Sequence, residues 1–170
     1  LVYGSGTSTE EHAIIDFCSI YDNTNMGIFI NDADNPNVSV LYTALYGNGS
    51  DGIYCQLTSP EISHCTVAHN ALDGIELNNA TGSKLSYNII ASNGGYGLKC
   101  VSTTPDHSYN DVWDNTAGDY SGCTAGFGDT SEDPIFCDGP GGDVSVHASS
   151  PTLAGGLGAL GVGCPEGPQN

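Results

Sequence analysis

The stretch VAHNALDGIEL, residues 67–77, contains the repeat unit of this chain: a hydrophobic pair, an Asn, and then a Gly followed by a hydrophobic residue. The Asn occurs five times, with steps of 25, 22, 23 and 22 residues between Asn23, Asn48, Asn70, Asn93 and Asn115. A period of this length is typical of a solenoid, in which each turn buries its apolar face only against its neighbours.

Alignment of the repeats on the Asn reveals further columns of similar residues. Three residues before it stand Ile20, Leu45, Val67, Ile90 and Val112, and four after it stand Gly27, Gly52, Gly74 and Gly97. The apolar positions recur with the period of short strands, and no window shows the spacing of an amphipathic helix. We expect Gly and Asn at bends where the backbone needs a positive φ. Each turn should therefore contain three short strands, which predicts an all-β, parallel β-helix.

The length of 170 residues is enough for one domain with a core inside the coil. We expect about five to seven turns over residues 1–123, followed by an irregular C-terminal cap and tail of the same domain over residues 124–170. The first residues, 1–3, have the pattern of the last strand of an earlier turn. That interpretation predicts an excised fragment with a bare strand stack at its N-terminal end, where molecules could associate head to tail.

The repeat resembles that of right-handed parallel β-helix proteins of the pectin-lyase-like superfamily. The segment from Tyr109 to Cys164, with NDVWDN at 110–115, GDYSGC at 118–123 and DPIFC at 133–137, is more specific. It is similar to the C-terminal end of β-helix domains in secreted or cell-surface bacterial proteins. The resemblance implies the fold and an extracellular location, and says little about activity because one fold hosts many functions.

The charge of the chain is strongly one-sided, with 20 acidic residues against Lys84 and Lys99, a formal net charge of −18. Phosphate binding needs clustered basic residues, so nucleic acid and anionic membrane surfaces are excluded as partners. No apolar run is long enough to span a membrane. The acidity has two interpretations: solubility of a secreted protein, or binding of a divalent cation such as Ca²⁺. No cofactor is expected to be required.

Four of the seven cysteines fall in two columns of the repeat. Cys18 and Cys65 share one column and Cys55 and Cys100 share another, each pair separated by two turns. Two turns correspond to about 9.6 Å, beyond the roughly 7 Å that a disulfide spans between Cα atoms. We therefore expect these four cysteines to be buried and to pack as small hydrophobic residues.

Two disulfides remain compatible with the spacing. Cys100 and Cys123 can pair across one turn if Gly118 or Asp119 adds one residue. Cys137 and Cys164 flank the irregular C-terminal segment, where a bridge would enclose 26 residues. No zinc-ligand spacing of Cys and His is present.

Paired carboxylates provide the first candidate site. Asp51 and Asp73 stand three residues after consecutive repeat Asn residues, which places them about 5 Å apart on adjacent turns. Such a pair can bind Ca²⁺, or act as nucleophile and acid in a glycosidase. The alternative is structural, because Asp-Gly is common turn chemistry. Asp32 and Asp34, in an insertion after the first repeat, form a further candidate for Ca²⁺ or an acidic turn.

The outward column of the third strand provides the second candidate, a sugar-binding surface made of Phe29, Tyr54, Glu76 and Lys99. The alternative is a row of neighbours that only stabilises the sheet. A third column lies beside a bend and faces either inward or outward; it contains Phe17, Tyr42, His64, Tyr87 and Tyr109.

Enzymes of the superfamily imply parts that this chain lacks. The sequence has no Arg, the basic residue with which pectate lyases commonly abstract the proton, and Glu76 should keep Lys99 protonated. None of the polygalacturonase motifs is present. The leading hypothesis is therefore a non-catalytic, secreted or cell-surface module with a structural, adhesion or assembly role. The alternatives are a carbohydrate-binding module, or a polysaccharide lyase or glycoside hydrolase that works at Asp51 and Asp73.

Overall fold

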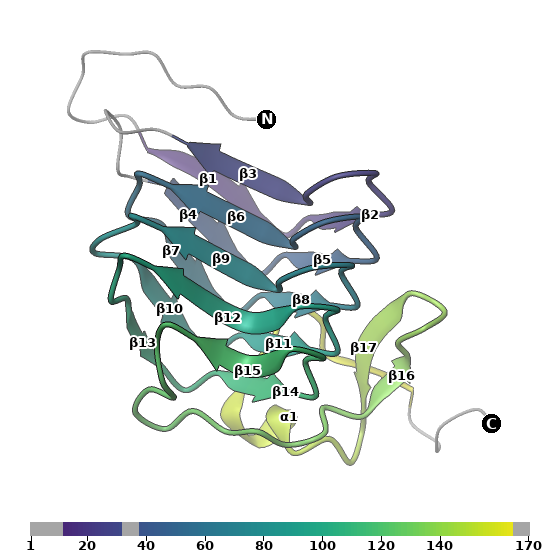
Figure 1. Ribbon diagram of the computed structural model, residues 1–170. Helices are drawn as coiled ribbons and strands as arrows, with labels where there is room; N and C mark the ends of the chain where they lie inside the picture. The colour runs from purple at the N-terminus through teal and green to yellow at the C-terminus, as the bar shows by residue number, and fades with distance from the viewer. Residues whose placement is uncertain (1–11, 32–37, 165–170) are drawn as a thin grey trace.

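The chain winds into a parallel β-solenoid whose turns each contribute one short strand to three sheets (Figure 1). The structure is a computed structural model and describes residues 12–31 and 38–164. Sheet A contains β1 (Ala13–Asp16), β4 (Val38–Leu41), β7 (Glu61–Ser63), β10 (Lys84–Ser86) and β13 (Asp106–Ser108). Sheet B contains β2 (Ser19–Tyr21), β5 (Ala44–Tyr46), β8 (Thr66–Ala68), β11 (Ile89–Ala91) and β14 (Asp111–Trp113). Sheet C contains β3 (Ile28–Asn31), β6 (Ile53–Gln56), β9 (Ile75–Asn78), β12 (Tyr96–Val101) and β15 (Gly118–Ser121).

Between the first and the last of the five strands in each sheet the coil completes about four turns, slightly fewer than the five to seven expected. The reason lies after β15, where the chain stops adding strands to the three sheets. Residues 122–135 form no further strand of the three sheets, and their β-type pairing with the last turn is limited to two isolated bridges, Ser108 with Phe127 and Asp111 with Thr130. The all-β, parallel class expected from the repeat is confirmed.

The bends contain residues in the left-handed region of the backbone, but these are mostly not the residues expected. The bend between sheets A and B has φ of 44–57° at Phe17, Tyr42, His64, Tyr87 and Tyr109. The next bend has φ of 50–63° at Asp22, Gly47, His69, Ser92 and Asp114. Bulky side chains rarely adopt this conformation. In the first of these bends each ring is stacked on the ring of the neighbouring turn, which supports the backbone there. The prediction that Gly and Asn occupy these positions was wrong for most turns.

The glycine column before the third strand is required by space rather than by φ. A Cβ atom on Gly74 would lie 2.6 Å from Ile90 Cγ2 and 2.8 Å from both Asn93 Nδ2 and the carbonyl oxygen of Gly97. Real Cβ atoms essentially never approach other atoms so closely. The backbone therefore passes directly over the repeat Asn of the next turn, and only Gly fits there.

The repeat Asn side chains form a continuous hydrogen-bonded ladder inside the coil. Asn70 is representative: its Oδ1 accepts from the backbone N of Asn48 (3.1 Å) and from Asn48 Nδ2 (2.9 Å). Its Nδ2 donates to Asn93 Oδ1 (3.0 Å) and to the carbonyl oxygen of Leu45 (3.2 Å). All four hydrogen-bonding positions of the amide are thereby used. The ladder ends when Asn115 donates to Asp119 Oδ1 (3.2 Å from Nδ2).

A second, shorter ladder lies at the bend between sheets A and B, in the column of Cys65. Cys65 N donates to Asn88 Oδ1 (2.9 Å), and Asn88 Nδ2 donates to Asn110 Oδ1 (2.9 Å). This ladder also ends at a carboxylate, because Asn110 donates from N (2.8 Å) and Nδ2 (3.1 Å) to Asp129 Oδ1. A carboxylate accepts without donating, so it is a suitable last member.

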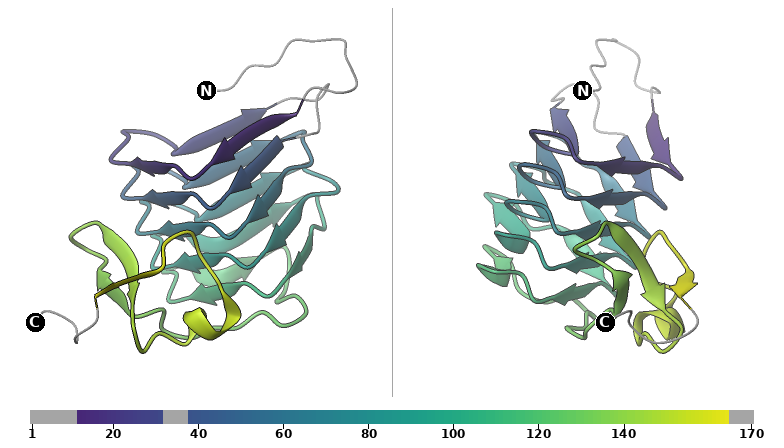
Figure 2. Two further views of the ribbon diagram at one scale, coloured as in Figure 1. Left: turned by 180° about the vertical axis from the view of Figure 1, so that it is seen from behind. Right: turned by 90° about the vertical axis from the view of Figure 1, so that its right-hand side faces the viewer.

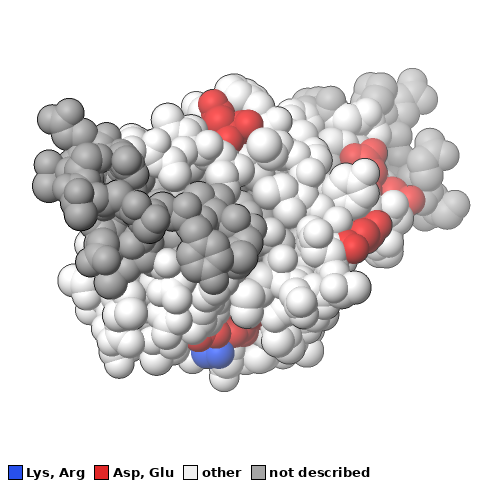
Figure 3. Space-filling view, turned by 90° about the horizontal axis from the view of Figure 1, so that it is seen from above, with Lys and Arg blue, Asp and Glu red and all other residues white. Residues whose placement is uncertain are grey.

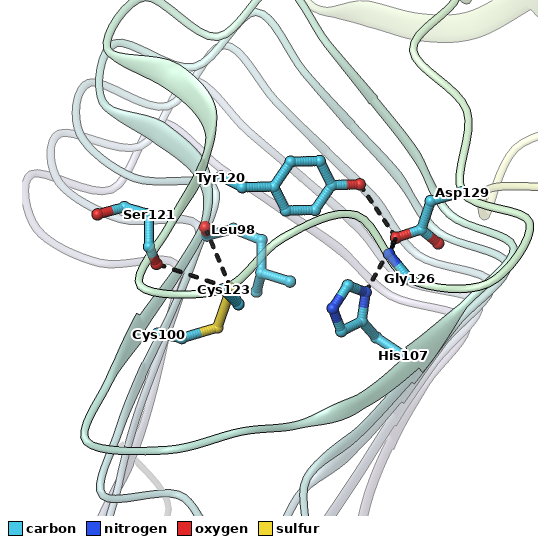
Figure 4. Close-up of a disulfide and its surroundings, with 8 residues drawn as sticks. All are labelled: Leu98, Cys100, His107, Tyr120, Ser121, Cys123, Gly126 and Asp129. Atoms are coloured by element: carbon cyan, nitrogen blue, oxygen red, sulfur yellow. Dashed lines mark hydrogen bonds and ion pairs between the residues drawn. A yellow bond between two sulfur atoms is a disulfide. The ribbon is translucent and has the colours of Figure 1, made fainter.

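Asp129 also closes the base of the coil (Figure 4). Its Oδ2 accepts from Gly126 N (2.8 Å), His107 Nδ1 (2.9 Å) and Tyr120 OH (3.0 Å). Burial by itself raises the pKa of this carboxyl, but the hydrogen bonds outweigh that effect and lower the pKa to about 2. Asp129 is therefore held as an anion in a polar plug beneath the apolar core.

The apolar core fills the inside of the coil, where Val40, Ile62, Leu45 and Val67 are fully buried. A second apolar layer lies outside sheet B. It is formed by β17 (Asp143–His147), whose Val144 packs on Ala44 and Ala68 and whose Val146 packs on Ile89 and Ala91.

The C-terminal segment thus folds back beside the coil instead of only covering its end (Figure 2). β17 forms sheet D with β16 (Phe136–Asp138) and β18 (Val162–Cys164), and the short helix α1 (Thr152–Gly155) follows β17. No helix in the part of the chain that the structure describes has the length and hydropathy of a membrane span.

The glycine column yields a first prediction. Gly74→Ala should lower the free energy of unfolding by roughly 1–3 kcal/mol, because the added methyl group forces apart two hydrogen-bonded turns. Urea unfolding followed by circular dichroism measures the loss. Gly161→Ala is the matched control, since nothing lies within 4 Å of its Cβ position. Equal stability of the two variants would contradict the steric role of Gly74.

The Asp129 plug yields a second prediction. At pH 7, Asp129→Asn should be less stable than the wild type by roughly 1–3 kcal/mol, because three donors lose their charged acceptor. The folded pKa of about 2 lies below the ordinary value of 3.8, so this stabilisation is present above pH 3.8 and is lost as the pH falls through 2. Thermal unfolding between pH 7 and pH 2 should show the two proteins converging. A difference that stays constant over this range would argue against an ionised Asp129.

Candidate functional site

The outer face of sheet C carries the predicted column of aromatic and charged residues on consecutive strands. Phe29, Tyr54, Glu76 and Lys99 are paired in register from β3 to β12, and each is partly exposed. The strands alternate strictly, so the residues on either side of each of these four point into the core. The C-terminal segment, as far as the structure describes it, packs on sheet B instead.

Lys99 joins the two candidate sites into one cluster. Its Nζ lies 2.8 Å from Glu76 Oε2 and 3.0 Å from Asp73 Oδ2. The hydrogen bonds that Lys99 donates to Glu76 and to Asp73 raise its pKa, with Glu76 the larger cause, and they outweigh the lowering by burial. Lys99 is therefore a permanent cation within an acidic cluster, and it is not a base. Figure 3 shows a basic group in direct contact with acidic ones, whereas other acidic groups on that face are separate.

Asp51 and Asp73 are brought together as expected, and both are also bonded to backbone. Asp51 is 4% exposed and its Oδ1 accepts from the backbone N of Asp73 (2.9 Å). Asp73 is 6% exposed and its Oδ1 accepts from the backbone N of Tyr96 (2.6 Å). Each carboxylate thus fastens the start of the third strand in the next turn. Burial raises the pKa of Asp51 by more than the hydrogen bond from the backbone N of Asp73 lowers it.

Three carboxylates of this cluster have the geometry of a cation site. One oxygen from each of Asp51, Asp73 and Glu76 lies within 4.8 Å of the others. Oxygen ligands of this kind suit Ca²⁺, but the Lys99 ammonium group already contacts two of the three. Ca²⁺ would have to displace Lys99 or bind beside it. Asp32 and Asp34 lie outside the described residues.

The aromatic pair on the same face is partly open to solvent. The rings of Phe29 and Tyr54 are 5.5 Å apart and inclined by 39°. A depression of about 390 Å³ lies beside Phe29, lined also by Asn25, Met26 and Ser50. Tyr54 is held by a hydrogen bond from Asn78 Nδ2 to its hydroxyl (3.2 Å).

The column at the bend between sheets A and B, whose direction the sequence left open, faces outward. We call it the aromatic ladder, and it comprises Phe17, Tyr42, His64, Tyr87, Tyr109 and Phe127. Successive ring centroids lie 4.8–5.5 Å apart. The first and last rings, Phe17 and Phe127, are 76% and 77% exposed. Phe127 lies after the repeats, so the columns of the sequence did not reveal it as a member.

The cysteines form two disulfides in the structure, Cys100–Cys123 and Cys137–Cys164, with Cα separations of 5.7 and 5.8 Å. The first fastens the chain after β15 to β12 (Figure 4), and the second fastens β16 to β18. Cys55 and Cys65 are free and buried, and burial raises the pKa of both thiols, that of Cys65 to about 12. Cys18 is exposed, contrary to expectation, and it lies in the first described turn.

These features define a class of protein: a parallel β-solenoid with a buried ladder of asparagine side chains and an acidic cluster that is ion-paired with Lys99. A family model described as the right-handed β-helix region matches residues 2–121, and the chain belongs to this family. No curated protein and no solved structure matches the chain.

The Lys99 cluster yields a third prediction. Lys99→Met should lower the free energy of unfolding by roughly 1–3 kcal/mol in EDTA, because Asp73 and Glu76 lose their cation. Adding Ca²⁺ should then raise the melting temperature of the variant by several degrees, and that of the wild type by less. Calorimetry measures both shifts. Lys84→Met on sheet A is the matched control, and an identical Ca²⁺ response in all three proteins would contradict a cation role for Lys99.

Proposed function

We propose that this chain is a non-catalytic module of a secreted or cell-surface protein, with a structural, adhesion or assembly role. The observation that carries this proposal is the closed cluster on sheet C. Lys99 is bound to Asp73 and Glu76, and Asp51 and Asp73 are bound to backbone N–H groups. Groups that are engaged in this way stabilise the stacking of turns and are poorly available for proton transfer.

The extracellular part of the proposal is supported by the cysteine chemistry and the charge. One disulfide lies at the end of the coil and the other lies within the C-terminal segment, and such bonds persist in oxidising compartments. A formal net charge of −18 keeps separate molecules apart and soluble.

Carbohydrate binding on sheet C is the second candidate function. It is favoured by the inclined Phe29–Tyr54 pair and the depression beside Phe29, because an aromatic face can stack on a sugar ring. A lyase or hydrolase at Asp51 and Asp73 is less well supported, since both carboxylates are almost completely buried.

A fourth prediction tests the proposed function. Incubation of the chain with neutral and acidic polysaccharides, with and without Ca²⁺, should release no reducing ends beyond those seen with heat-denatured protein. Release that Asp51→Asn or Asp73→Asn abolished, while the control Asp22→Asn at an exposed position retained it, would overturn the non-catalytic role.

Affinity electrophoresis of the wild type and of Tyr54→Ala on the same polysaccharides tests the second candidate function. Retardation that Tyr54→Ala removes would support carbohydrate binding on sheet C.

A further inference from the structure

The C-terminal end of the aromatic ladder borders a pocket that is separate from sheet C. The pocket has a volume of about 170 Å³, and its walls come from the ladder, the segment after the coil, and α1. Its lining includes Tyr87, Tyr109, Thr130, Glu132, Thr152 and Leu157. The C-terminal segment creates this pocket by folding back beside sheet B, and the repeat alone would not form it.

The polar wall of the pocket is fixed by a buried carboxylate behind it. Asp111 is fully buried, and its Oδ1 accepts from Thr130 Oγ1 (3.0 Å) and from the backbone N of Glu132 (2.9 Å). Its Oδ2 is buried and has no hydrogen-bond partner among the described residues. Thr130 and Glu132 are therefore held in place on the wall.

Neighbouring rings occupy the faces of both tyrosines, so what these residues can offer the pocket is their edges and hydroxyl groups. The rings of Tyr87 and Tyr109 are stacked 5.4 Å apart and are almost parallel, at 4°. Tyr87 is also stacked on His64 on its other side, at 5.1 Å. A cation is attracted to a ring face and not to its edge, so this wall does not favour an ammonium or guanidinium group.

The charge of the pocket also excludes an anionic ligand. Apart from the tyrosines, Glu132 is the one ionisable residue among those that line the pocket. Neither of the two lysines of the chain lines the pocket. What remains complementary is an uncharged ring with hydroxyl groups. Its hydroxyls can donate to Glu132 and exchange hydrogen bonds with the tyrosines, while its apolar edge rests against Leu157 and Pro151.

We propose that this pocket binds a single uncharged sugar unit, at the end or at a branch of a neutral polysaccharide. The site lies on a different face from the Phe29–Tyr54 pair and involves no catalytic step. It gives the proposed adhesion module a specific ligand class, and to that extent it rests on the proposed function. A failure here would not affect the predicted result of the cleavage assay, so the two proposals can be distinguished.

The test is a titration of the isotope-labelled full chain, followed by amide NMR spectra. The probes are hexasaccharides of β-1,4-linked glucose, mannose and xylose, with polygalacturonate and oligolysine as charged probes. At least one neutral hexasaccharide should shift the amide signals of Gly128, Thr130 and Leu157, with a dissociation constant at or below about 1 mM. The charged probes should not shift these signals.

Conservative variants separate the pocket from the rest of the ladder. Tyr87→Phe combined with Tyr109→Phe keeps both rings and removes both hydroxyls, and Glu132→Gln removes the charge. Each should weaken binding by about 3- to 10-fold, the effect of losing one or two hydrogen bonds. Tyr42→Phe is the matched control, since Tyr42 belongs to the same ladder outside the pocket, and it should bind as the wild type does.

Several results would overturn the proposal. They are an absence of shifts with all three neutral probes at about 10 mM, shifts confined to the surroundings of Tyr54, and binding of polygalacturonate or oligolysine in the pocket. Binding that the pocket variants leave unchanged would overturn it as well.

Discussion

The stacked asparagine amides are the interaction on which this structure depends. A coil that bends three times per turn leaves backbone N–H and C=O groups facing its interior, where water cannot bind them. An amide that accepts two hydrogen bonds and donates two, as Asn70 does, satisfies one bend and joins it to the turns on both sides. Asp119 and Asp129 end the two ladders because a last amide needs an acceptor.

A ladder inside the coil leaves the outward columns free to differ from one another. On sheet C, an outward column became a charge cluster in which Lys99 neutralises part of a buried acidic group. At the bend between sheets A and B, the outward column became a stack of rings in an unfavourable backbone region. Ligand recognition in such a fold therefore depends on these columns and on the C-terminal segment that borders one of them, and the buried repeat only sets their spacing.

Some expectations failed because an aligned position of the repeat does not reveal which physical constraint selects the residue type at that position. Gly74 was expected at a bend with positive φ, but the limiting factor is the space above Asn93. The second ladder went unrecognised because only Asn88 and Asn110 of its column are Asn, and Asp129, which ends it, lies beyond the repeats. Cys18 was expected to be buried by analogy with Cys65, yet it is exposed in the first described turn.

Sequence alone was sufficient for the parallel β-solenoid, the inner and outer columns of each strand, and the approach of Asp51 to Asp73. All of these follow from a period near 22 residues, because equal residues in successive turns must stack. The tertiary structure was needed for everything that breaks the period: the fold-back of β17 onto sheet B, the polar plug at Asp129, and the pocket beside Tyr109. Contacts between a repeating coil and a non-repeating segment have no register in the sequence, so only packing in three dimensions determines them.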